Sequence, residues 1–394
     1  MNQCKCLTRC ASSAASSRLM NENAIDHLVD SELLIRRYPQ AVVCPTVSND
    51  IEGRRKGGGV CCEGNWVVGA QMHRGFFPMS ELYVPHECVY EDFDVVYLGM
   101  LHDCWGHCIT DNIKHLWPFV TGEIKKYLSQ GVKLIYVTLQ HDTKIPSNFV
   151  ELLKMIGVDW EQLVRVQRPT RFRNVYVPDE SFYYDVDRRM RCYTKEFLQT
   201  IDCVVGRCGA DSVAIDRRIY LSRSRWRVRN SFAERDVERA FCAAGYEIVY
   251  PETLGLAEMV HLMRSCRTVA ATEGSCAHNS LFMREGAALV ILRKADYLNG
   301  YQVVLNQMRS LQVTYVDANR STMLSRSDMP WAGPFFVFVS HELADLLGVR
   351  MRFPYWEYGK YLAYGLLIRL TWAFGVHEIA VRCAQFLQKK RCWR

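Results

Sequence analysis

The segment TVAATEGSCAHNSLFMR, residues 268–284, joins a short apolar run to a helix-like run through a turn of small residues. The first backbone N–H groups of a helix lack internal partners, and the helix dipole favours negative charge there. Gly274 lets a ligand approach the backbone closely, and Ser275 can cap the helix. A strand, a turn and a helix in this order predict an anion-binding site, and the ligand we expect there is a diphosphate. We therefore expect a nucleotide-linked substrate.

The sequence around this turn alternates between strand-like and helix-like runs. Strands are expected at 217–221, 246–250, 267–272, 287–292 and 312–316, and helices at 232–244, 256–265, 276–284 and 301–310. Alternation with short connections predicts a parallel sheet with helices on both faces. Such sheets bind ligands beyond the carboxyl ends of their strands, which is where Gly274 lies.

The first half of the chain shows a similar alternation. Strands are expected at 94–98, 133–139 and 172–177, and helices at 106–120, 149–156 and 187–203. Two α/β halves predict a cleft between them. The expected division is a disordered tail at 1–23, an α/β domain at 24–205, a linker at 206–216, a second α/β domain at 217–350, and C-terminal helices with a basic tail at 351–394.

The composition narrows the class of partner. The net charge of +7 suits an anionic ligand or an anionic lipid surface but is too small to indicate a nucleic acid. The 17 cysteines are an odd number, and residues 1–23 lack the apolar segment of a secretory signal. We therefore expect free thiols and a cytoplasmic protein. The longest apolar run, 361–376, is interrupted by Arg369 and is too short to span a bilayer.

Polar side chains follow three strands of the second half, at the edge where a ligand is expected. Arg223 follows the first strand and could hold a phosphate through two parallel hydrogen bonds. Glu252 follows the second, although it could instead cap a helix. Glu273 could accept hydrogen bonds from ribose hydroxyls, and His278 could face the diphosphate. The residues predicted to bind this ligand are Ser222, Arg223, Glu252, Glu273, Gly274, Ser275, His278 and Asn279.

A second polar cluster follows a strand of the first half, in GMLHDCWGHCITD at residues 99–111. His107 and Asp111 are one helical turn apart, so the carboxylate could orient the imidazole. A neutral His107 beside the cleft could take a proton from a hydroxyl group. The alternative is a solvated polar face of the helix, and we prefer that alternative for Lys114.

Two Asp-x-Asp triplets could hold a metal ion, because paired carboxylates bind Mg²⁺ or Mn²⁺ against a diphosphate. Asp92 and Asp94 precede their strand and so lie at the wrong end for the cleft. Asp185 and Asp187 open an arginine-rich helix, where acidic residues interact favourably with the dipole. Metal use is therefore disfavoured and no cofactor is expected, with a metal-dependent transferase using Asp185 and Asp187 as an alternative.

Four motifs, taken in order, resemble glycosyltransferase family 61 in its branch of capsular polysaccharide biosynthesis proteins. They are GMLHDCWGHCITD (99–111), RRIYLSR (217–223), GYEIVYPE (245–252) and TEGSCAHNSLF (272–282), and the resemblance covers residues 90–345. It implies a GT-B-like fold with two Rossmann-like domains, a nucleotide-sugar donor, an inverting transfer and no obligatory metal. Eukaryotic relatives usually carry His-Gly-Ala where this chain has Glu273-Gly274-Ser275, which fits the bacterial-type branch.

These observations combine into one hypothesis, a glycosyltransferase of cell-surface polysaccharide synthesis. His107, oriented by Asp111, would deprotonate the hydroxyl of a glycan or lipid-linked glycan acceptor, while the diphosphate rests on Arg223 and the Gly274 turn. The basic tail could contact anionic lipid at the inner face of the membrane. For residues 357–385, however, we prefer packing across the first domain. A non-catalytic scaffold that binds a nucleotide sugar is the alternative from a different class.

Overall fold

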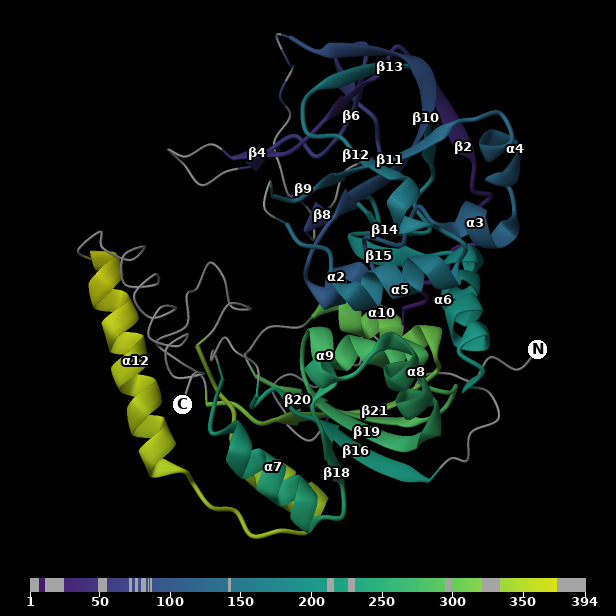
Figure 1. Ribbon diagram of the computed structural model, residues 1–394. Coiled ribbons are helices and arrows are strands. Elements are labelled where there is room, and N and C mark those ends of the chain that lie inside the picture. Colours follow the sequence, from purple (N-terminus) through teal and green to yellow (C-terminus); the bar gives the residue numbers. More distant parts are fainter. Residues whose placement is uncertain are drawn as a thin grey trace.

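The computed structural model describes residues 7–10, 25–48, 55–70, 73–74, 77–78, 83, 85, 87–140, 143–210, 216–225, 231–294, 299–320 and 334–373. Figure 1 shows the strands of the first half above those of the second half, with helices between the two groups. The chain is therefore a mixed α/β protein, as the alternation predicts. Predictions for other residues, including most of the tail 1–23 and residues 211–215 of the linker, fall outside the described residues.

The sheet of the second half contains six strands, all parallel. Their order is β1 (Leu7–Cys10), β21 (Gln312–Asp317), β20 (Ala288–Arg293), β19 (Cys266–Thr272), β16 (Arg217–Leu221) and β18 (Glu247–Val249). From β18 to β21 this is the order 2-1-3-4-5 of doubly wound sheets, which bind ligands where the order reverses. That point is the carboxyl edge of β16 and β19.

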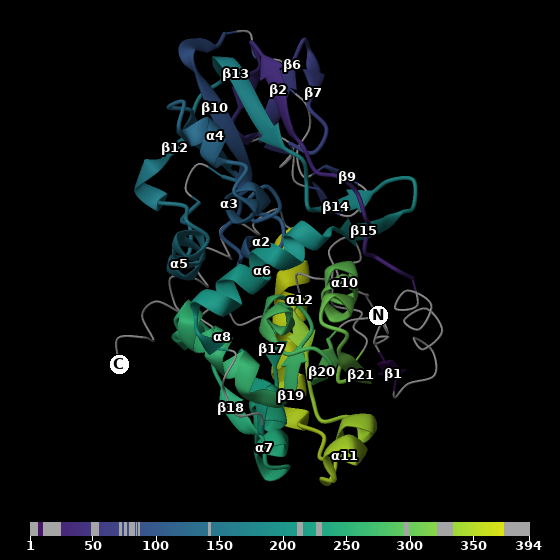
Figure 2. The same ribbon diagram turned by 90° about the vertical axis from the view of Figure 1, so that its right-hand side faces the viewer.

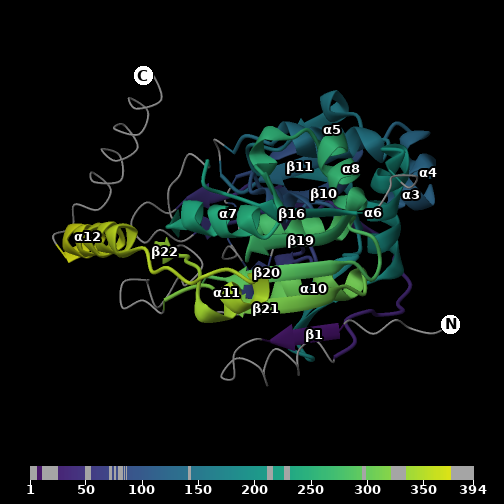
Figure 3. The ribbon, with the colours of Figure 1, turned by 90° about the horizontal axis from the view of Figure 1, so that it is seen from below.

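One strand of this sheet comes from the segment expected to be a disordered tail. Leu7–Cys10 forms β1 and pairs with β21, and Figure 3 shows it at the edge of the sheet beside β21. A parallel edge strand needs only main-chain partners, so the polar composition of the tail gave no signal for it.

The helices of the second half are α7 (Glu234–Ala243), α8 (Leu256–Ser265), α9 (Ser275–His278), α10 (Gly300–Met308) and α11 (His341–Leu347). One continuous α-helix was predicted at 276–284, and this is wrong. Helix α9 makes one turn and the chain continues as the 3₁₀ turn η4 (Asn279–Phe282). The side chain of Asn279 donates to the carbonyl of Cys276 at 3.1 Å and so competes for an acceptor of the helix.

The sheet of the first half mixes parallel and antiparallel strands. Its order is β12 (Leu163–Arg165), β11 (Lys133–Thr138), β10 (Val89–Leu101), β13 (Thr170–Pro178), β3 (Val42–Cys44), β6 (Gly59–Cys62) and β7 (Asn65–Trp66), with β2 (Ile35–Pro39) also paired to β13. The four strands from β12 to β13 are parallel, and the others run antiparallel. The Rossmann-like alternation expected here is thus found only in the parallel part.

Two helices predicted in the first half differ from the structure. Residues 106–120 form α2 (Trp105–Cys108) and α3 (Trp117–Thr121) with turns between them. Asn112 interrupts the helix, since its side chain bonds both the N–H and the carbonyl of His102, at 3.0 and 2.9 Å.

Residues 187–203 were expected to be one helix, and the structure contradicts this. The segment begins in the hairpin of β14 (Phe182–Asp185) and β15 (Met190–Tyr193), and only then enters α6 (Lys195–Arg207). Arg189 adopts φ 55° in the hairpin turn, where a helix cannot continue. Figure 2 shows α6 crossing the molecule between the two sheets.

The remaining described elements are short, apart from α5 and α12. They are α4 (Lys125–Leu128), α5 (Ser147–Met155), η1 (Trp160–Gln162), η3 (Pro251–Thr253), the strand pairs β4 (Val47–Ser48) with β5 (Arg55–Lys56), β8 (His73–Arg74) with β9 (Phe77–Pro78), and β17 (Ser231–Phe232) with β22 (Phe335–Phe336), and finally α12 (Tyr355–Ala373). No helix in the part of the chain that the structure describes is long and apolar enough to cross a bilayer.

One apolar cluster connects the two halves. It includes Leu98 and Ile201 of the first half together with Leu256 and Leu281 of the second half. Helix α5 contacts α8, α6 contacts η4, and α2 contacts α9. The two halves are therefore packed against each other at the layer of helices that also carries the candidate site.

For residues 357–385 we expected packing across the first half, and helix α12 does not pack there. Its main described contacts are with β17 and β22, and Figure 1 shows it standing away from both sheets. Residues 374–385 lie outside the described residues.

Candidate active site

The carboxyl edge of the parallel sheet brings three charged residues together. Arg223 follows β16, Glu273 follows β19, and Lys294 follows β20. Between them, Gly274 adopts φ 120° and ψ −157°, a conformation that L side chains rarely take. A Cβ on Gly274 would lie 3.3 Å from the Nζ of Lys294, so the ammonium group lies directly against this turn.

The two cations at this edge have no ion-pair partner among the described residues. The closest ring to Lys294 is that of Phe335, whose centroid lies 4.4 Å from Nζ. Burial lowers the pKa of Lys294, and the neighbouring charge of Arg223 lowers it further. Two cations held close together beside a glycine turn are an arrangement that can bind an anionic group.

Glu273 and Glu234 are the buried carboxyl groups beside these cations. Burial raises the pKa of each. Glu234 accepts a hydrogen bond from the backbone N–H of Arg223 at 2.7 Å and so fixes the start of the loop after β16. Glu273 accepts one from the backbone N–H of Asn299 at 3.0 Å and so fixes the connection between β20 and α10.

Ser222 and Glu252 have different positions from the other predicted ligand-binding residues. The Ser222 side chain is fully buried, and its hydroxyl donates to Glu238 at 2.5 Å. The same hydroxyl accepts from the backbone N–H of Ser224 at 3.0 Å. Ser222 therefore shapes the turn after β16, whereas Glu252 lies exposed in η3.

Ser275, His278 and Asn279 contact the first half through α2. The Asn279 carboxamide oxygen accepts from the Trp105 indole N–H at 2.8 Å, and the Ser275 hydroxyl lies 3.3 Å from the Sγ of Cys104. A Cβ on Gly106 would lie 2.8 Å from both the Ser275 hydroxyl and the Nδ1 of His278. Helix α9 thus packs tightly on α2, and Ser275, expected to cap α9, makes no capping hydrogen bond.

His278 is buried, and burial lowers its pKa to about 3. Its Nε2 lies 3.4 Å from the side-chain nitrogen Nδ2 of Asn299, and its ring stacks on that of Tyr301 with the centroids 6.1 Å apart. The imidazole is therefore neutral at physiological pH. With one turn of α9 instead of a long helix, anion binding at this edge depends mainly on the cations, because a helix dipole needs several turns of aligned peptides.

Across from this edge, His107 and Asp111 form a closely bonded pair. The Nδ1 of His107 lies 2.6 Å from the Oδ2 of Asp111. Burial acts to raise the pKa of Asp111, but the hydrogen bond and charge of His107 outweigh it and hold that pKa well below its usual range. An ionised carboxylate only accepts, so Nδ1 carries the proton and Nε2 of the neutral ring has the free lone pair.

Tyr301 links this pair to the second half. It belongs to α10, and its hydroxyl donates to the Oδ1 of Asp111 at 3.2 Å. The ring centroids of Tyr301 and His107 lie 5.7 Å apart in an edge-to-face arrangement. The Arg191 guanidinium carbon lies 3.5 Å from the centroid of the Tyr301 ring. On its other side His107 stacks on His102 at 4.6 Å. Both oxygens of Asp111 therefore have donors, one from each half of the chain.

Residues 105–290 match the family model described as Glycosyltransferase 61. The matched range contains the His107–Asp111 pair, Arg223 and the Gly274 turn. Over this range the chain belongs to glycosyltransferase family 61. A search of the curated proteins gives no match. As members of this family are glycosyltransferases, the protein is an enzyme that uses a sugar donor and an acceptor, which disfavours the non-catalytic scaffold.

The carboxylates that we considered for a metal are arranged differently in this glycosyltransferase. Asp185 and Asp187 lie in the hairpin of β14 and β15, and not at the start of a helix. Asp185 accepts from the backbone N–H of Arg188 at 2.9 Å, and Asp187 is exposed. Among the residues with a described placement, no group of three or more His, Cys, Asp or Glu side chains could hold a metal ion.

Sequence reasoning missed two residues of the glycosyltransferase site and misjudged a third. Lys294 is the first residue after a strand, which is the signal that identified Arg223. Tyr301 gave no such signal, because it contacts Asp111 only in the folded chain. Lys114 is 3% exposed and pairs with Glu180, so the solvated face predicted for it is wrong.

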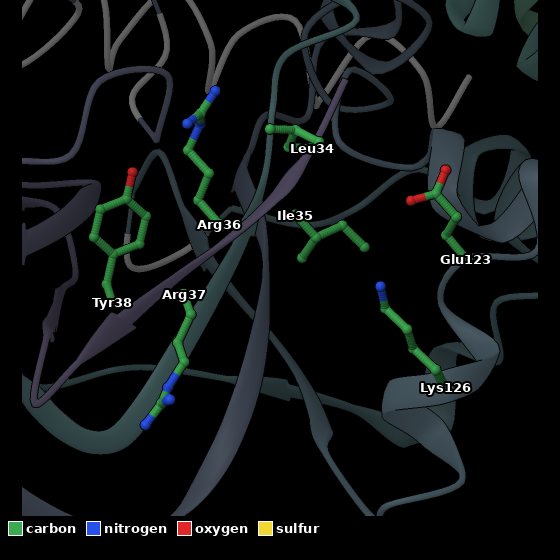
Figure 4. A pocket seen from close by; sticks show the side chains of 7 residues that line it. All are labelled: Leu34, Ile35, Arg36, Arg37, Tyr38, Glu123 and Lys126. Atoms are coloured by element: carbon green, nitrogen blue, oxygen red, sulfur yellow. The ribbon is translucent and has the colours of Figure 1, made fainter. Parts of the chain in front are cut away.

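A hollow of about 520 Å³ lies in the first half of the glycosyltransferase, away from these residues. Figure 4 shows its lining side chains, which come from β2 and from the segment of Glu123 and Lys126. Arg36 is bonded to Asp179 and Arg37 to Asn174, each at 2.8 Å. None of the residues that line this hollow belongs to the predicted site.

Proposed function

We propose that the enzyme transfers a sugar from a nucleoside-diphosphate sugar to a hydroxyl of a glycan, with inversion and without a divalent metal ion. The observation that carries the proposal is a pair of cations, Arg223 and Lys294, that have no ion-pair partner among the described residues. They face the His107–Asp111 pair through the contact of α9 with α2. A GT-B-like arrangement, with the donor on the second half and the acceptor on the first, is part of this proposal.

The donor diphosphate is bound by Arg223 and Lys294 beside the Gly274 turn. The guanidinium can donate two parallel hydrogen bonds to a phosphate, and the ammonium adds a point charge. As the glycosidic bond to the diphosphate breaks, negative charge grows on the leaving group. Two preorganised cations in a partly dry site stabilise that charge, which is the task that a metal ion performs in other transferases.

The acceptor hydroxyl loses its proton to the Nε2 of His107. The resulting imidazolium is stabilised by Asp111, whose carboxylate stays ionised because of the low pKa described above. The deprotonated oxygen attacks the anomeric carbon from the face opposite the diphosphate, so the new bond forms as the bond to phosphate breaks and the anomeric configuration inverts. The proton stays on the imidazole of His107 and is later released to water.

The acceptor in this proposal is a glycan or a lipid-linked glycan of cell-surface or capsular polysaccharide synthesis in the cytoplasm. Support for it is the resemblance of the four motifs to the capsular branch, together with the net charge of +7. Twelve cysteines in the described part of the chain are free thiols, which is compatible with a reducing compartment.

A thermal-shift screen of UDP-, GDP- and CMP-sugars tests the donor class, because a bound ligand raises the melting temperature by mass action. CMP-sugars carry one phosphate, so a diphosphate site should favour the UDP- or GDP-sugars. The proton NMR spectrum of the product then gives the anomeric configuration. Retention of configuration would contradict the direct displacement. Activity lost in EDTA and restored by Mn²⁺ would favour the alternative that uses Asp185 and Asp187, and binding without transfer would favour the scaffold.

A further inference from the structure

Helix α12 presents a long apolar surface that the rest of the described chain does not cover. Its 19 residues make a rod about 28 Å long. Near its start, Tyr361 is buried among Phe232, Phe336 and Tyr358. The main contacts of α12 are with β17 and β22, and its Tyr358 also lies against Phe353 and Arg320. Figure 3 shows the helix projecting from the body of the molecule.

The outer side of α12 is wide and carries no charge. Leu362, Leu366 and Leu370 recur every fourth residue and share one side of the helix. Trp356 and Leu367 flank this stripe and are 76% and 57% exposed. The full set of uncharged exposed residues on this side is Tyr355, Trp356, Gly359, Leu362, Ala363, Leu366, Leu367 and Leu370. Contiguous apolar surface of this kind on a protein marks an interaction site.

The charges around this surface are almost all positive. Exposed cations are Arg350 and Arg352 before the helix and Lys360 and Arg369 on it, against the single acidic residue Glu357. Glu357 is already bonded to Lys360 at 2.5 Å. The sequence after α12 adds Arg382, Lys389, Lys390, Arg391 and Arg394 against Glu378 alone. A partner that covers the apolar side therefore meets the cations on α12 and just before it, and the sequence that follows is basic as well.

We propose that α12 docks on an anionic phospholipid surface, with its leucine stripe in the interface and its cations at the headgroups. A lipid interface accepts apolar side chains and attracts the surrounding cations, each of which contributes about 1 kcal/mol near an anionic surface. Trp356 and Tyr355 belong to the residue types that prefer the level of the headgroups. A second copy of this chain would bring the same cations together, and their repulsion disfavours a symmetric dimer through this face.

The docking surface is separate from Arg223, Lys294 and His107, so it stands independently of the proposed reaction. It would hold the enzyme at the membrane, where a lipid-linked acceptor is found. Sugar transfer to a soluble acceptor does not depend on it.

Flotation of the full chain with vesicles tests this proposal. We expect binding to vesicles of phosphatidylcholine with phosphatidylglycerol, weak binding to phosphatidylcholine alone, and release by high salt. The double variant Trp356→Glu, Leu366→Glu places two acidic groups on the exposed side and should weaken partitioning roughly tenfold or more. As both side chains are largely exposed, the variant should melt at the wild-type temperature.

Val68→Glu is the matched control, because Val68 is a 95% exposed apolar residue in the first half. It should bind vesicles like the wild type. The proposal is overturned if the wild type ignores anionic vesicles, or if the double variant binds them as well as the wild type does. Light scattering that finds a wild-type dimer, converted to monomer by the double variant and without vesicle binding, would assign the face to a second copy. The double variant should transfer sugar to a soluble acceptor as the wild type does. This control distinguishes a failure of the membrane proposal from a failure of the proposed reaction.

Discussion

The two sides of the candidate site satisfy their polar groups differently. On the donor side, Arg223 and Lys294 approach the Gly274 turn with no ion-pair partner among the described residues. On the acceptor side, the carboxylate of Asp111 has a donor on each oxygen, His107 on one and Tyr301 on the other. Partly buried cations that make no ion pair cost stability even with Glu234 and Glu273 beside them, whereas a fully bonded dyad is rigid.

This difference indicates two tasks. The two cations that make no ion pair among the described residues can pair with an anionic ligand, so the donor side is suited to binding one. A histidine whose Nδ1 is fixed by a carboxylate presents Nε2 in one tautomer and one direction, so the acceptor side is suited to proton transfer. Changes on the acceptor side should therefore slow turnover, and changes on the donor side should weaken donor binding.

The largest expected effect is that of His107→Gln. Removal of a general base lowers kcat by about 10²–10⁴-fold, while the donor KM should change little. Steady-state kinetics with the donor identified by thermal shift provides the measurement. His261→Gln in α8, which is not at the site, is the control and should behave as the wild type. A large rise in donor KM with kcat preserved would place His107 on the donor side instead.

Removing either donor-side cation comes next. Arg223→Ala or Lys294→Ala should raise the donor KM by about 10–100-fold, since a hydrogen bond to a charged group contributes roughly 1.5–3 kcal/mol. Each variant should also lower kcat, because the same cation stabilises the charge on the leaving diphosphate. Arg217→Ala is the matched control, because Arg217 lies at the opposite end of β16 and pairs with Glu247. Donor kinetics that are unchanged in both Arg223→Ala and Lys294→Ala would remove the diphosphate assignment.

The contact between the two sides is tested by Gly106→Ala. The added Cβ would meet His278 and Ser275 at 2.8 Å, so α2 and α9 must separate. Such overpacking costs about 1–3 kcal/mol of unfolding free energy, and turnover should fall with it. Gly206→Ala in α6 is the control, because a Cβ there meets nothing within 4 Å. A Gly106→Ala variant with wild-type denaturation and turnover would show that the two halves do not need this packing.

The smallest expected effect is on the pH dependence of stability. Burial lowers the pKa of His278 and of His115 to about 3, so between pH 3 and 6.5 these two histidines bind more protons in the unfolded chain than in the folded chain. Their contribution to stability is therefore greatest above pH 6.5 and falls on acidification, by about 1 kcal/mol per histidine between pH 7 and 5.5, while the raised pKa of Glu273 acts in the opposite direction. Urea midpoints at the two pH values measure this, and His278→Asn should reduce the slope. A slope that His278→Asn leaves unchanged would contradict the neutral, buried imidazole.

The second half was the more predictable part of the fold. Each of its strands has a short apolar run, and these runs alternate with helix-like segments, so the pattern alone locates β16, β18, β19, β20 and β21. In the first half, buried polar side chains replace helix hydrogen bonds. Asn112 bonds the backbone of His102, and this breaks the helix expected at 106–120. Local propensity cannot show such tertiary bonds.

The candidate site was predictable where it follows the ends of strands. The same rule that selects Arg223 and Glu273 would also have selected Lys294. Tyr301 is separated from Asp111 by 190 residues of sequence, and their hydrogen bond exists only when the two halves meet. Ser275 and Asn279 were placed near the ligand by the turn, but their side chains contact Cys104 and Trp105 of the other half.

Titration calorimetry of a nucleoside diphosphate into three proteins tests the division of tasks most directly. The proteins are the wild type, His107→Gln and Lys294→Ala. We predict the same dissociation constant for the wild type and His107→Gln, and a dissociation constant roughly tenfold or more higher for Lys294→Ala. Equal affinities in all three proteins, or a loss of binding in His107→Gln alone, would contradict a donor side built on Arg223 and Lys294.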